Sequence, residues 1–335
     1  MEEKVLLGHG NGGKYTQRLV KELFHHYFRN DLLDEMNDAA GFSTPGERLA
    51  FTTDSYVISP LSFPGGDIGK LAVCGTVNDL AVSGARPLYL SAGFIIEEGF
   101  PMASLRQIVQ SMADTAKVAG VLIVTGDTKV VPKGCADQLF INTAGIGVIL
   151  PGADVSGSYA RPGNKIIING TIGDHGMTIM ARRSELNFNN LLRSDCAPLN
   201  GLIQELLLDV PGIRVLRDPT RGGVATTLNE IAVQSGVGIA LDEDSLPVQG
   251  SVKSACDILG LDPLYLANEG KFLTVVPQPQ VEAALNVIRK HPLGQDAAVI
   301  GEVVDGPVGK VYLKTGIGGK RIVDVLVVDQ LPRIC

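Results

Sequence analysis

The chain has 335 residues, of which 45% are hydrophobic and 19% charged, a composition typical of a globular protein long enough for two domains. Its net charge of −7, without a clustered basic stripe, argues against nucleic-acid binding as the main task. No apolar run is long enough to cross a bilayer, and residues 1–4 lack the basic start of a signal peptide, so no membrane partner is expected.

The cysteines indicate the redox compartment. There are five of them, an odd number, widely spread along the chain and without a CxxC pair. That pattern is typical of free thiols in a reducing cytoplasm, and it argues against both a disulfide framework and a structural zinc site. We therefore expect a cytoplasmic protein.

The hydrophobic pattern of the first half predicts alternating helices and strands. In chain order the expected elements are a glycine-rich opening at 8–14, a helical stretch around 19–28, a strand at 49–53, a helix at 69–83, a strand at 88–97, a helix at 102–119, a buried strand at 121–124 and a strand at 139–150.

The second half follows a loop-like segment at 151–158 and again mixes strands with helices. Its expected elements are a strand at 165–169, helices at 177–184 and 199–209, a helix opened by residues 217–223 and running to about 234, a strand at 270–276, a helix at 279–290, and strands at 297–304, 309–314 and 321–328. We therefore divide the chain into a glycine-rich arm and helix, an N-terminal domain, a C-terminal domain and a tail, at 1–40, 41–152, 160–325 and 326–335.

Three aspartates follow apolar or small residues in the first half, and they are candidate magnesium ligands: Asp54, Asp79 and Asp127. Magnesium prefers hard oxygen ligands, often one or two carboxylates together with phosphate oxygens. Carboxylates gathered from separate elements could bridge to a nucleotide through the metal. Aspartate also commonly caps a turn or a helix start, so both interpretations stay open at this point.

The glycine-rich opening at 8–13 could wrap backbone amides around an anion. It matches neither the P-loop nor the Rossmann pattern, and a flexible arm is the alternative interpretation. Lys14 and Lys129 could pair with phosphate, although most lysines are simply solvated. His9 and His175 are candidates because they lie in glycine-rich loops.

Two segments of the second half also carry candidate chemistry. Residues 218–223 put a carboxylate, a hydroxyl and a guanidinium at the start of a predicted helix, a place suited either to an anion or to a simple cap. Glu269 directly precedes an apolar strand, where its carboxylate could act as a general base or could form a polar turn.

The last residue, Cys335, is a thiol at a chain end. Termini are mobile unless they are tied down, Pro332 stiffens the segment before the tip, and Arg333 offers a planar charged fork. Such a tail could present the thiol to an active site, carry a group on it and hand that group on. An incidental terminal cysteine is the alternative.

Taken together, these segments resemble the HypE family of hydrogenase maturation proteins, over essentially the whole chain. That family belongs to the ATP-binding superfamily that also holds aminoimidazole ribonucleotide synthetase and selenophosphate synthetase. The terminal PRIC is the segment specific to the family. The matching segments, in order, are GHGNGG at 8–13, TDS at 53–55, GTVNDLA at 75–81, TGDTKV at 125–130, GDHG at 173–176, RDPTRGG at 217–223, NEG at 268–270 and PRIC at 332–335.

The resemblance implies an α+β protein with two mixed α/β domains and a flexible C-terminal tail. It also implies a homodimer in which two N-terminal sheets pair into a β-barrel, with ATP and Mg²⁺ near that interface. The implied activity is ATP-dependent dehydration of a carbamoyl group on Cys335, from thiocarboxamide to thiocyanate. The implied partners are the carbamoyl transferase HypF and the iron-carrying HypC–HypD complex, which receives cyanide for the NiFe-hydrogenase.

The resemblance also implies roles for single residues. Cys335 would be the carrier, Glu269 the base and Lys129 a phosphate partner, while Asp54, Asp79 and Asp127 would surround Mg-ATP. The full set expected to contact ATP is Gly12, Gly13, Asp54, Asn78, Asp79, Gly126, Asp127, Thr128 and Asp218.

Two other functions remain open at this stage. A selenophosphate-synthetase-like kinase would use an N-terminal cysteine and lysine, but the opening loop has Lys14 and no cysteine. A non-catalytic carrier would use Cys335 only to shuttle a ligand between partners. ATP turnover separates these functions, because a pure carrier has none.

Overall fold

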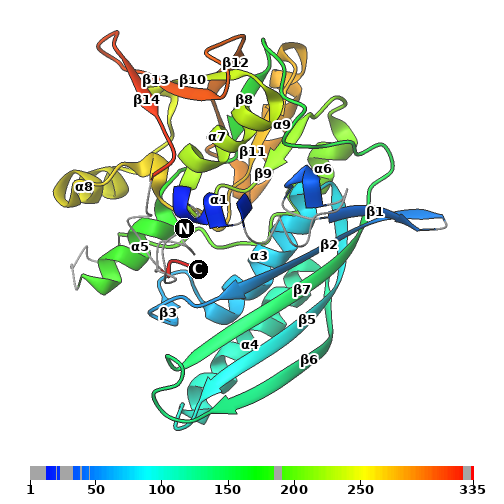
Figure 1. Ribbon diagram of the computed structural model, residues 1–335, viewed down its shortest axis with the longest axis vertical. Coiled ribbons are helices and arrows are strands. Elements are labelled where there is room, and N and C mark those ends of the chain that lie inside the picture. Colours follow the sequence, from blue (N-terminus) through cyan, green and yellow to red (C-terminus); the bar gives the residue numbers. More distant parts are fainter. Residues whose placement is uncertain are drawn as a thin grey trace.

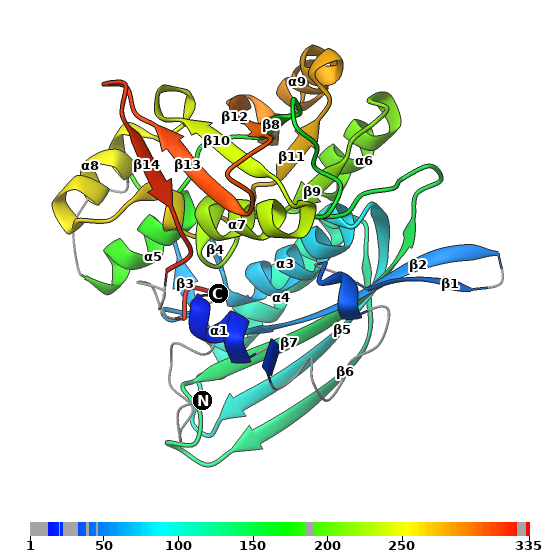
Figure 2. The ribbon, with the colours of Figure 1, turned by 45° about the horizontal axis from the view of Figure 1, so that its top comes forward.

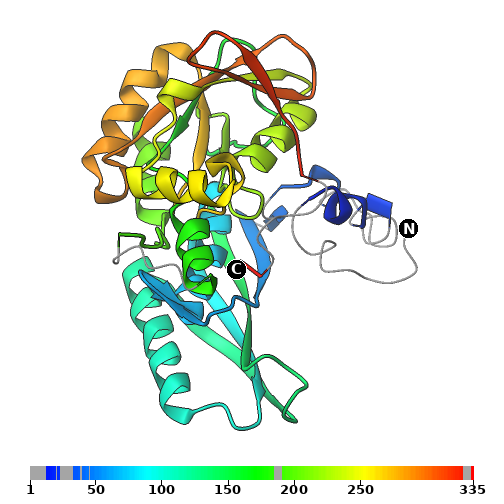
Figure 3. The same ribbon diagram turned by 90° about the vertical axis from the view of Figure 1, so that its left-hand side faces the viewer.

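The structure is a computed structural model that describes residues 13–19, 21–22, 33–37, 40–44, 46–184, 191–326 and 333–335. Within these ranges, each half of the chain builds one main sheet covered by helices (Figure 1). Figure 3 shows the two halves stacked, with the described C-terminal end lying between them. The expected mixture of strands and helices in both halves is confirmed.

The N-terminal sheet has five strands in the order β1-β2-β7-β5-β6, and only the β5–β6 pair is parallel. Two helices, α3 and α4, pack against each other and bury a common core with this sheet. The bounds are β1 Ala40–Thr44, β2 Glu47–Tyr56, α3 Ile68–Val82, β5 Ala85–Glu97, α4 Met102–Ala119, β6 Leu122–Val131 and β7 Leu139–Ile149. A short hairpin, β3 Ser62–Phe63 and β4 Gly66–Asp67, precedes α3.

The expectation of a short buried strand at 121–124 is wrong. Strand β6 runs through Leu122–Val131 and is exposed along nearly its whole length, with Leu122 at 64% and Val124 at 57%. It is one of the two edge strands of the sheet and therefore has a neighbour on one side only. An apolar strand left uncovered in one chain is a surface for a partner or a hazard for aggregation.

Gly75 lies in the middle of α3, where glycine costs about 1 kcal/mol relative to alanine. The buried side chain of Tyr56 explains it, because a Cβ at position 75 would lie 2.2 Å from the Tyr56 hydroxyl. The ring is buried in the core, which leaves it little room to shift. Gly75 therefore allows α3 to approach β2 closely.

We expect Gly75→Ala to lower the free energy of unfolding by about 1–3 kcal/mol, because overpacking a core costs that much even where helix propensity improves. Gly201→Ala in helix α6 (Asn200–Asp209) is the matched control, since nothing lies within 4 Å of a Cβ there. Urea unfolding measures both variants. Equal stability of the two variants would contradict the steric explanation.

The C-terminal sheet has seven strands in the order β14-β13-β10-β12-β8-β11-β9. Figure 2 shows α7 in front of this sheet and α9 behind it. The strands are β8 Lys165–Ile168, β9 Val215–Arg217, β10 Gly238–Asp242, β11 Leu273–Val276, β12 Ala298–Val304, β13 Lys310–Lys314 and β14 Lys320–Val323, and the helices are α5 Asp174–Arg183, α6 Asn200–Asp209, α7 Gly223–Ser235, α8 Gly250–Leu259 and α9 Val281–Lys290.

Side-chain alternation along β8 explains why helices cover both faces of this sheet. Ile166 and Ile168 point into the core shared with α7, whereas Ile167 points into the core shared with α6 and α9. A strand buried on both faces is apolar throughout, and the run of three isoleucines fits this position. The sequence pattern did not predict β1, β9, β10 or α8.

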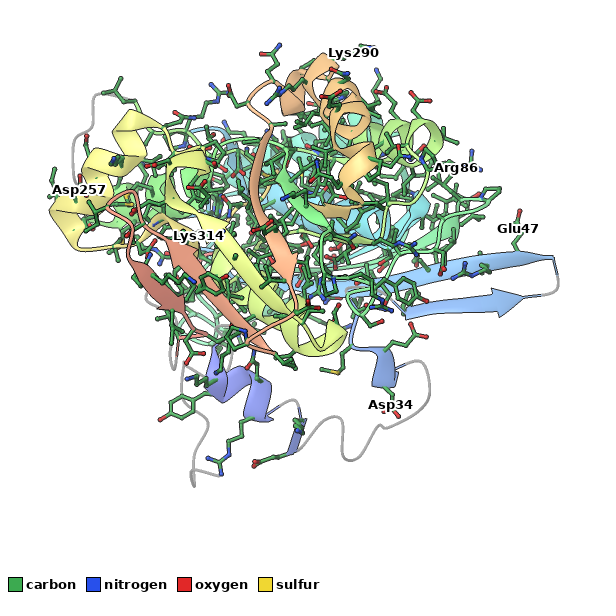
Figure 4. All side chains as sticks on the ribbon, turned by 90° about the horizontal axis from the view of Figure 1, so that it is seen from above. Asp34, Glu47, Arg86, Asp257, Lys290 and Lys314 are labelled. Carbon is green, nitrogen blue, oxygen red and sulfur yellow. The ribbon has the colours of Figure 1, made fainter. Side chains whose placement is uncertain are left out.

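Charged side chains lie at the outer surface, as Figure 4 shows for Asp257, Lys290 and Lys314 on three different elements of the C-terminal half. Within the described parts of the chain, no helix has the length and apolar character needed to cross a membrane.

Candidate active site between the two domains

One face of β2 carries the polar residues nearest to α3. Strand alternation puts Thr52, Asp54 and Tyr56 on the same face. The Thr52 hydroxyl donates to Oδ2 of Asp79 on α3 at 2.9 Å. Burial raises the pKa of Tyr56 well above its usual value, and the charges of Asp54 and Asp79 raise it further. Two of the three predicted magnesium ligands therefore lie close together.

Glu269 lies in the turn before β11 and is only 3% exposed. Among the described residues, its Oε1 has no hydrogen-bond partner. Burial raises the pKa of Glu269 well above its usual value, followed by the effect of Cys196 and the charges of Asp195, Asp218 and Asp54. A buried carboxyl with an unpaired oxygen is costly unless a ligand completes it, so Glu269 is a candidate for contact with a ligand.

Asn78 joins the two domains beside Glu269. Its Oδ1 accepts from the backbone N–H of Leu199 at 2.8 Å. Its Nδ2 donates to the carbonyl of Ala197 at 3.1 Å and to that of Glu269 at 3.4 Å. The amide of Asn78 therefore contacts three backbone groups of the C-terminal half and reaches the site through Glu269.

Arg221 lies at the start of α7 and faces the same centre. Its Nη2 lies 3.6 Å from Oδ1 of Asp54. The negative charge at Cys335 raises the pKa of Arg221 most, and Asp54 and Glu269 raise it further. Asp218, three residues earlier, is 7% exposed and is one of the negative neighbours of Glu269. Segment 217–223 thus brings a cation and a carboxylate to the site.

The end of the tail is bound to the N-terminal domain. The backbone N–H of Val57 donates to the main-chain oxygen of Cys335 at 3.1 Å, and Nε of Arg333 donates to the carbonyl of Val57 at 2.8 Å. Nη1 of Arg333 lies 2.6 Å from Oδ2 of Asp137. The flexible tail expected from the resemblance is therefore held by directional bonds over its last three residues in this conformation.

Helix α5 of the C-terminal domain holds the same tail from the other side. Nε2 of His175 lies 2.9 Å from the carbonyl oxygen of Ile334, and Arg183 donates to the carbonyl of Arg333. Ile334 is 2% exposed and belongs to the core that both domains share. The tail therefore bridges the domains and brings Cys335 to the group formed by Asp54, Arg221 and Glu269.

Asp127 lies apart from Asp54 and Asp79 in a single chain. Along the sheet, Asp54 pairs with Thr143, Thr143 with Ala92, and Ala92 with Gly126, so three strand spacings separate β2 from β6. At about 4.8 Å each, these spacings amount to roughly 14 Å. Within the described ranges, no three acidic, cysteine or histidine side chains form a metal-binding group.

The TGDTKV segment lies on exposed β6. Lys129 and Asp127 form an ion pair at 3.2 Å, with side-chain exposures of 71% and 70%, and the Lys129 hydrogen bond lowers the pKa of Asp127. Thr128 is exposed between them. A Cβ on Gly126 would lie 2.2 Å from the carbonyl oxygen of Ala92, so glycine is needed there for strand pairing.

The glycine-rich opening is described only from Gly13 onward, so His9 and Gly12 lie outside the described residues. Gly13 is buried, and its carbonyl accepts from Gln17 at 3.0 Å. Lys14 forms an ion pair with Asp324 at 3.1 Å, at the base of the tail.

Sequence reasoning missed Tyr56, Arg183 and Asp195. Tyr56 looks like an ordinary strand aromatic, and Arg183 like an exposed helix-end cation. Asp195 lies in SDC at 194–196, which has no ligand-binding spacing. Each becomes part of the site through contacts to residues far away in the chain, and a single sequence carries no signal for such contacts.

The two halves match two related families. The profile of the AIR synthase related protein N-terminal domain matches residues 36–149, and that of the AIR synthase related protein C-terminal domain matches residues 161–314. Together these matches cover well over half of the chain. The chain is therefore an AIR synthase-related protein, and the candidate site lies where its two matched domains meet.

Within this class, relatives that match over nearly the whole chain identify one family. The chain is 53% identical over 333 residues to carbamoyl dehydratase HypE of Cupriavidus necator, covering 99% of this chain and 95% of that one. It is similar to HypE in a crystal structure of a HypE–HypF complex, with 55% identity, a TM-score of 0.88, and 92% and 99% of the two chains covered. It is also similar to HypE crystallised with ATP, with 52% identity, a TM-score of 0.84, and 99% and 100% covered. The chain belongs to the HypE family.

Proposed function

We propose that this protein is an ATP-dependent carbamoyl dehydratase that converts a carbamoyl group on Cys335 into a thiocyanate. The observation that carries the proposal is the docked tail, which brings Cys335 to the buried group of Asp54, Arg221 and Glu269. The name of the Cupriavidus necator relative, carbamoyl dehydratase HypE, supports it.

The chemistry needs an activated oxygen and a base. Turning a thiocarboxamide into a thiocyanate expels the carbonyl oxygen, which is a poor leaving group as oxide. Transfer of the γ-phosphoryl group of ATP to that oxygen lets it leave as phosphate. The nitrogen loses two protons as the C≡N bond forms, so ATP and thiocarboxamide give ADP, phosphate and thiocyanate. Phosphoryl transfer depends mainly on positioning and charge neutralisation.

Glu269 is our candidate for the base. Its raised pKa makes its carboxylate a stronger base than an exposed glutamate, and the unpaired Oε1 is available to a substrate N–H. Arg221 carries the opposing charge nearby and favours the ionised carboxylate. Asp195 accepts the backbone N–H of Glu269 at 3.2 Å and helps to fix the turn.

The donor set on β2 and α3 fits Mg²⁺ with a nucleotide. Asp54 and Asp79 offer hard carboxylate oxygens from two rigid elements, and the Thr52 hydroxyl orients Asp79. When bound, magnesium neutralises phosphate charge. Asp218, Gly13 and Asn78 remain candidates around the nucleotide, Asn78 through its bond to the Glu269 carbonyl. The relative crystallised with ATP supports the nucleotide.

Asp127, Thr128 and Lys129 fit the proposal as residues that act across a homodimer. They lie on β6, whose exposed apolar side chains require cover. Pairing of two N-terminal sheets into a barrel would cover the strand. It would also bring Asp127 and Lys129 of one subunit toward the Asp54 and Asp79 of the other.

We expect Val124→Lys on β6 to weaken the homodimer by about 10²-fold or more, because burying an unpaired charge costs several kcal/mol. Ile317→Lys is the control, since Ile317 is 98% exposed in the C-terminal domain and outside the proposed interface. Light scattering at micromolar concentration reports the mass. A parent protein that is monomeric yet fully active as an ATPase would contradict the dimer.

The remaining partners are those that the resemblance to the HypE family implies. A carbamoylated cysteine requires a carbamoyl donor, and we propose HypF, supported by the relative solved in a HypE–HypF complex. The cyanide acceptor would be the iron of HypC–HypD, and the reaction would take place in the cytoplasm.

Intact mass spectrometry tests the function. Incubation with a carbamoylating partner should add the mass of one carbamoyl group to the chain, and ATP should then remove the mass of one water. Loading without any ATP turnover would support the carrier function instead. Phosphate transfer to a small acceptor without loading would support a kinase.

A further inference from the structure

A continuous chain of hydrogen bonds runs from the docked tail to the loop behind Glu269. Nε2 of His175 lies 2.9 Å from the carbonyl oxygen of Ile334, and its Nδ1 lies 2.8 Å from Oγ of Ser194. The same Oγ accepts the backbone N–H of Cys196 at 3.1 Å. His175 is fully buried and Ser194 is 7% exposed, so bulk water does not compete for these bonds.

The chemistry of the two ends fixes the direction of this chain. The carbonyl of Ile334 can only accept, so Nε2 of His175 carries the hydrogen and Nδ1 accepts from the Ser194 hydroxyl. Burial lowers the pKa of His175, which favours the neutral imidazole that this arrangement needs. When the tail leaves, the buried Nε2–H loses its acceptor, and an unsatisfied buried donor is costly.

The loop at the far end also holds the turn that carries the proposed base. Asp195 accepts the backbone N–H groups of Glu269 and Gly270, both at 3.2 Å, and the Lys271 ammonium at 3.1 Å. Burial acts to raise the pKa of Asp195, but the Lys271 ammonium and the hydrogen bond from the Glu269 N–H hold it below its usual value. Asp195 therefore stays ionised and keeps its grip on the turn.

Close backbone packing makes this link stiff. A Cβ on Gly270 would lie 1.9 Å from the carbonyl oxygen of Asp195, so the loop and the turn touch directly. The loop is also anchored to the N-terminal domain, where the Ser194 N–H donates to Pro64 at 2.8 Å. A shift at Ser194 is thus passed on to Glu269 rather than absorbed.

We propose that His175, Ser194 and Asp195 are positioning residues that couple docking of the C-terminal tail to the placement of Glu269. This inference rests on the proposed function. In that function the coupling places the base Glu269 only when the Cys335 thiol and its carbamoyl group are docked. Docking favours the arrangement in which the chain of bonds is complete, and departure of the tail releases the loop.

Amide hydrogen exchange tests the coupling without any turnover. The full chain is compared with a chain lacking residues 333–335. The Val57 amide, which donates to Cys335, reports docking itself. Tail removal should speed exchange at Val57 and also at 194–197 and 268–271. In Ser194→Ala, exchange at the last two segments should no longer depend on the tail.

Two further variants make the test specific. His175→Asn keeps a polar atom toward Ser194 but is too short to reach Ile334, so it should also lose the tail dependence. Thr178→Val is the control, because Thr178 is buried on the same helix and its hydroxyl donates to the Asp174 carbonyl of that helix at 2.7 Å. Thr178→Val should behave as the parent.

Kinetics supply the second readout. Ser194→Ala should lower the single-turnover rate of dehydration by roughly 10- to 10²-fold, the cost of a small misplacement, with the KM for ATP unchanged. Exchange that changes at Val57 but not at 194–197 and 268–271 would overturn the coupling, as would parent-like dehydration in Ser194→Ala. A tail effect on exchange in a protein without dehydratase activity would support the coupling and refute the proposed function.

Discussion

We expect Cys335→Ala to abolish thiocyanate formation, which is the largest effect of any substitution proposed for this protein. The thiol is the only attachment point for the carbamoyl group in the proposed reaction, so no slower route remains. Intact mass spectrometry should show neither the carbamoyl gain nor the later loss of water. ATP binding should persist, because the proposed nucleotide ligands lie on β2 and α3 rather than on the tail.

The control for this variant is Cys135→Ala, which removes an exposed thiol far along the chain. It should load and dehydrate as the parent does. Cys335 is half-buried against the core rather than enclosed by it, so the stability of Cys335→Ala should change by only about 0.5 kcal/mol. Thiocyanate on the Cys335→Ala protein would refute the carrier role of Cys335. Carbamoyl loading at Cys135 would show that Cys135 is the carrier instead.

Glu269→Gln should accept the carbamoyl group, bind ATP and then stall before dehydration. Glutamine has nearly the same shape but cannot take a proton, and loss of one general base costs on the order of 10²–10⁴ in rate. Mass spectrometry should therefore find Cys335 trapped as the thiocarboxamide with ATP present. Thiocyanate formation at the parent rate would show that Glu269 is a turn residue, with Lys129 and His175 the next candidates for the base.

The pH dependence of stability provides a control for Glu269→Gln, because the direction of the expected change is known. The pKa of Glu269 is raised in the folded protein, mainly by burial, so its contribution to stability is full at low pH and is lost as pH rises through the folded pKa. Glutamine carries no such charge. Glu269→Gln should therefore match the parent in thermal unfolding at acidic pH and be at least as stable at alkaline pH, so a kinetic defect cannot be attributed to unfolding.

Helices and strands with a clear period were predictable from local sequence. The helix expected at 102–119 matches α4 residue for residue, and the helix expected at 69–83 is α3 within one residue at each end. Both have apolar residues at helical spacing over several turns, and a glycine lies at or just after the end of each helix. Short strands such as β9, Val215–Arg217, were missed because three residues carry too little pattern to separate a strand from a loop.

Burial was less predictable than element type. The segment at 121–124 has the apolar run of an interior strand, yet the sheet order places β6 at an edge. An apolar run indicates that a strand is buried. It does not indicate whether the strand is buried by its own chain or by a partner. Strand β6 is such a case, because its apolar side chains are exposed in a single chain.

The sequence by itself determined the residue types at the site and their family: a terminal thiol, carboxylates after apolar segments, and the motifs of the HypE family. Only the tertiary structure decided which of them meet. Asp54, Arg221, Glu269 and Cys335 come from widely separated segments, and Asp127 stays about three strands away, at roughly 14 Å. Local propensity acts over a few residues, whereas the site depends on domain packing and on bonds such as that of His175 to the tail.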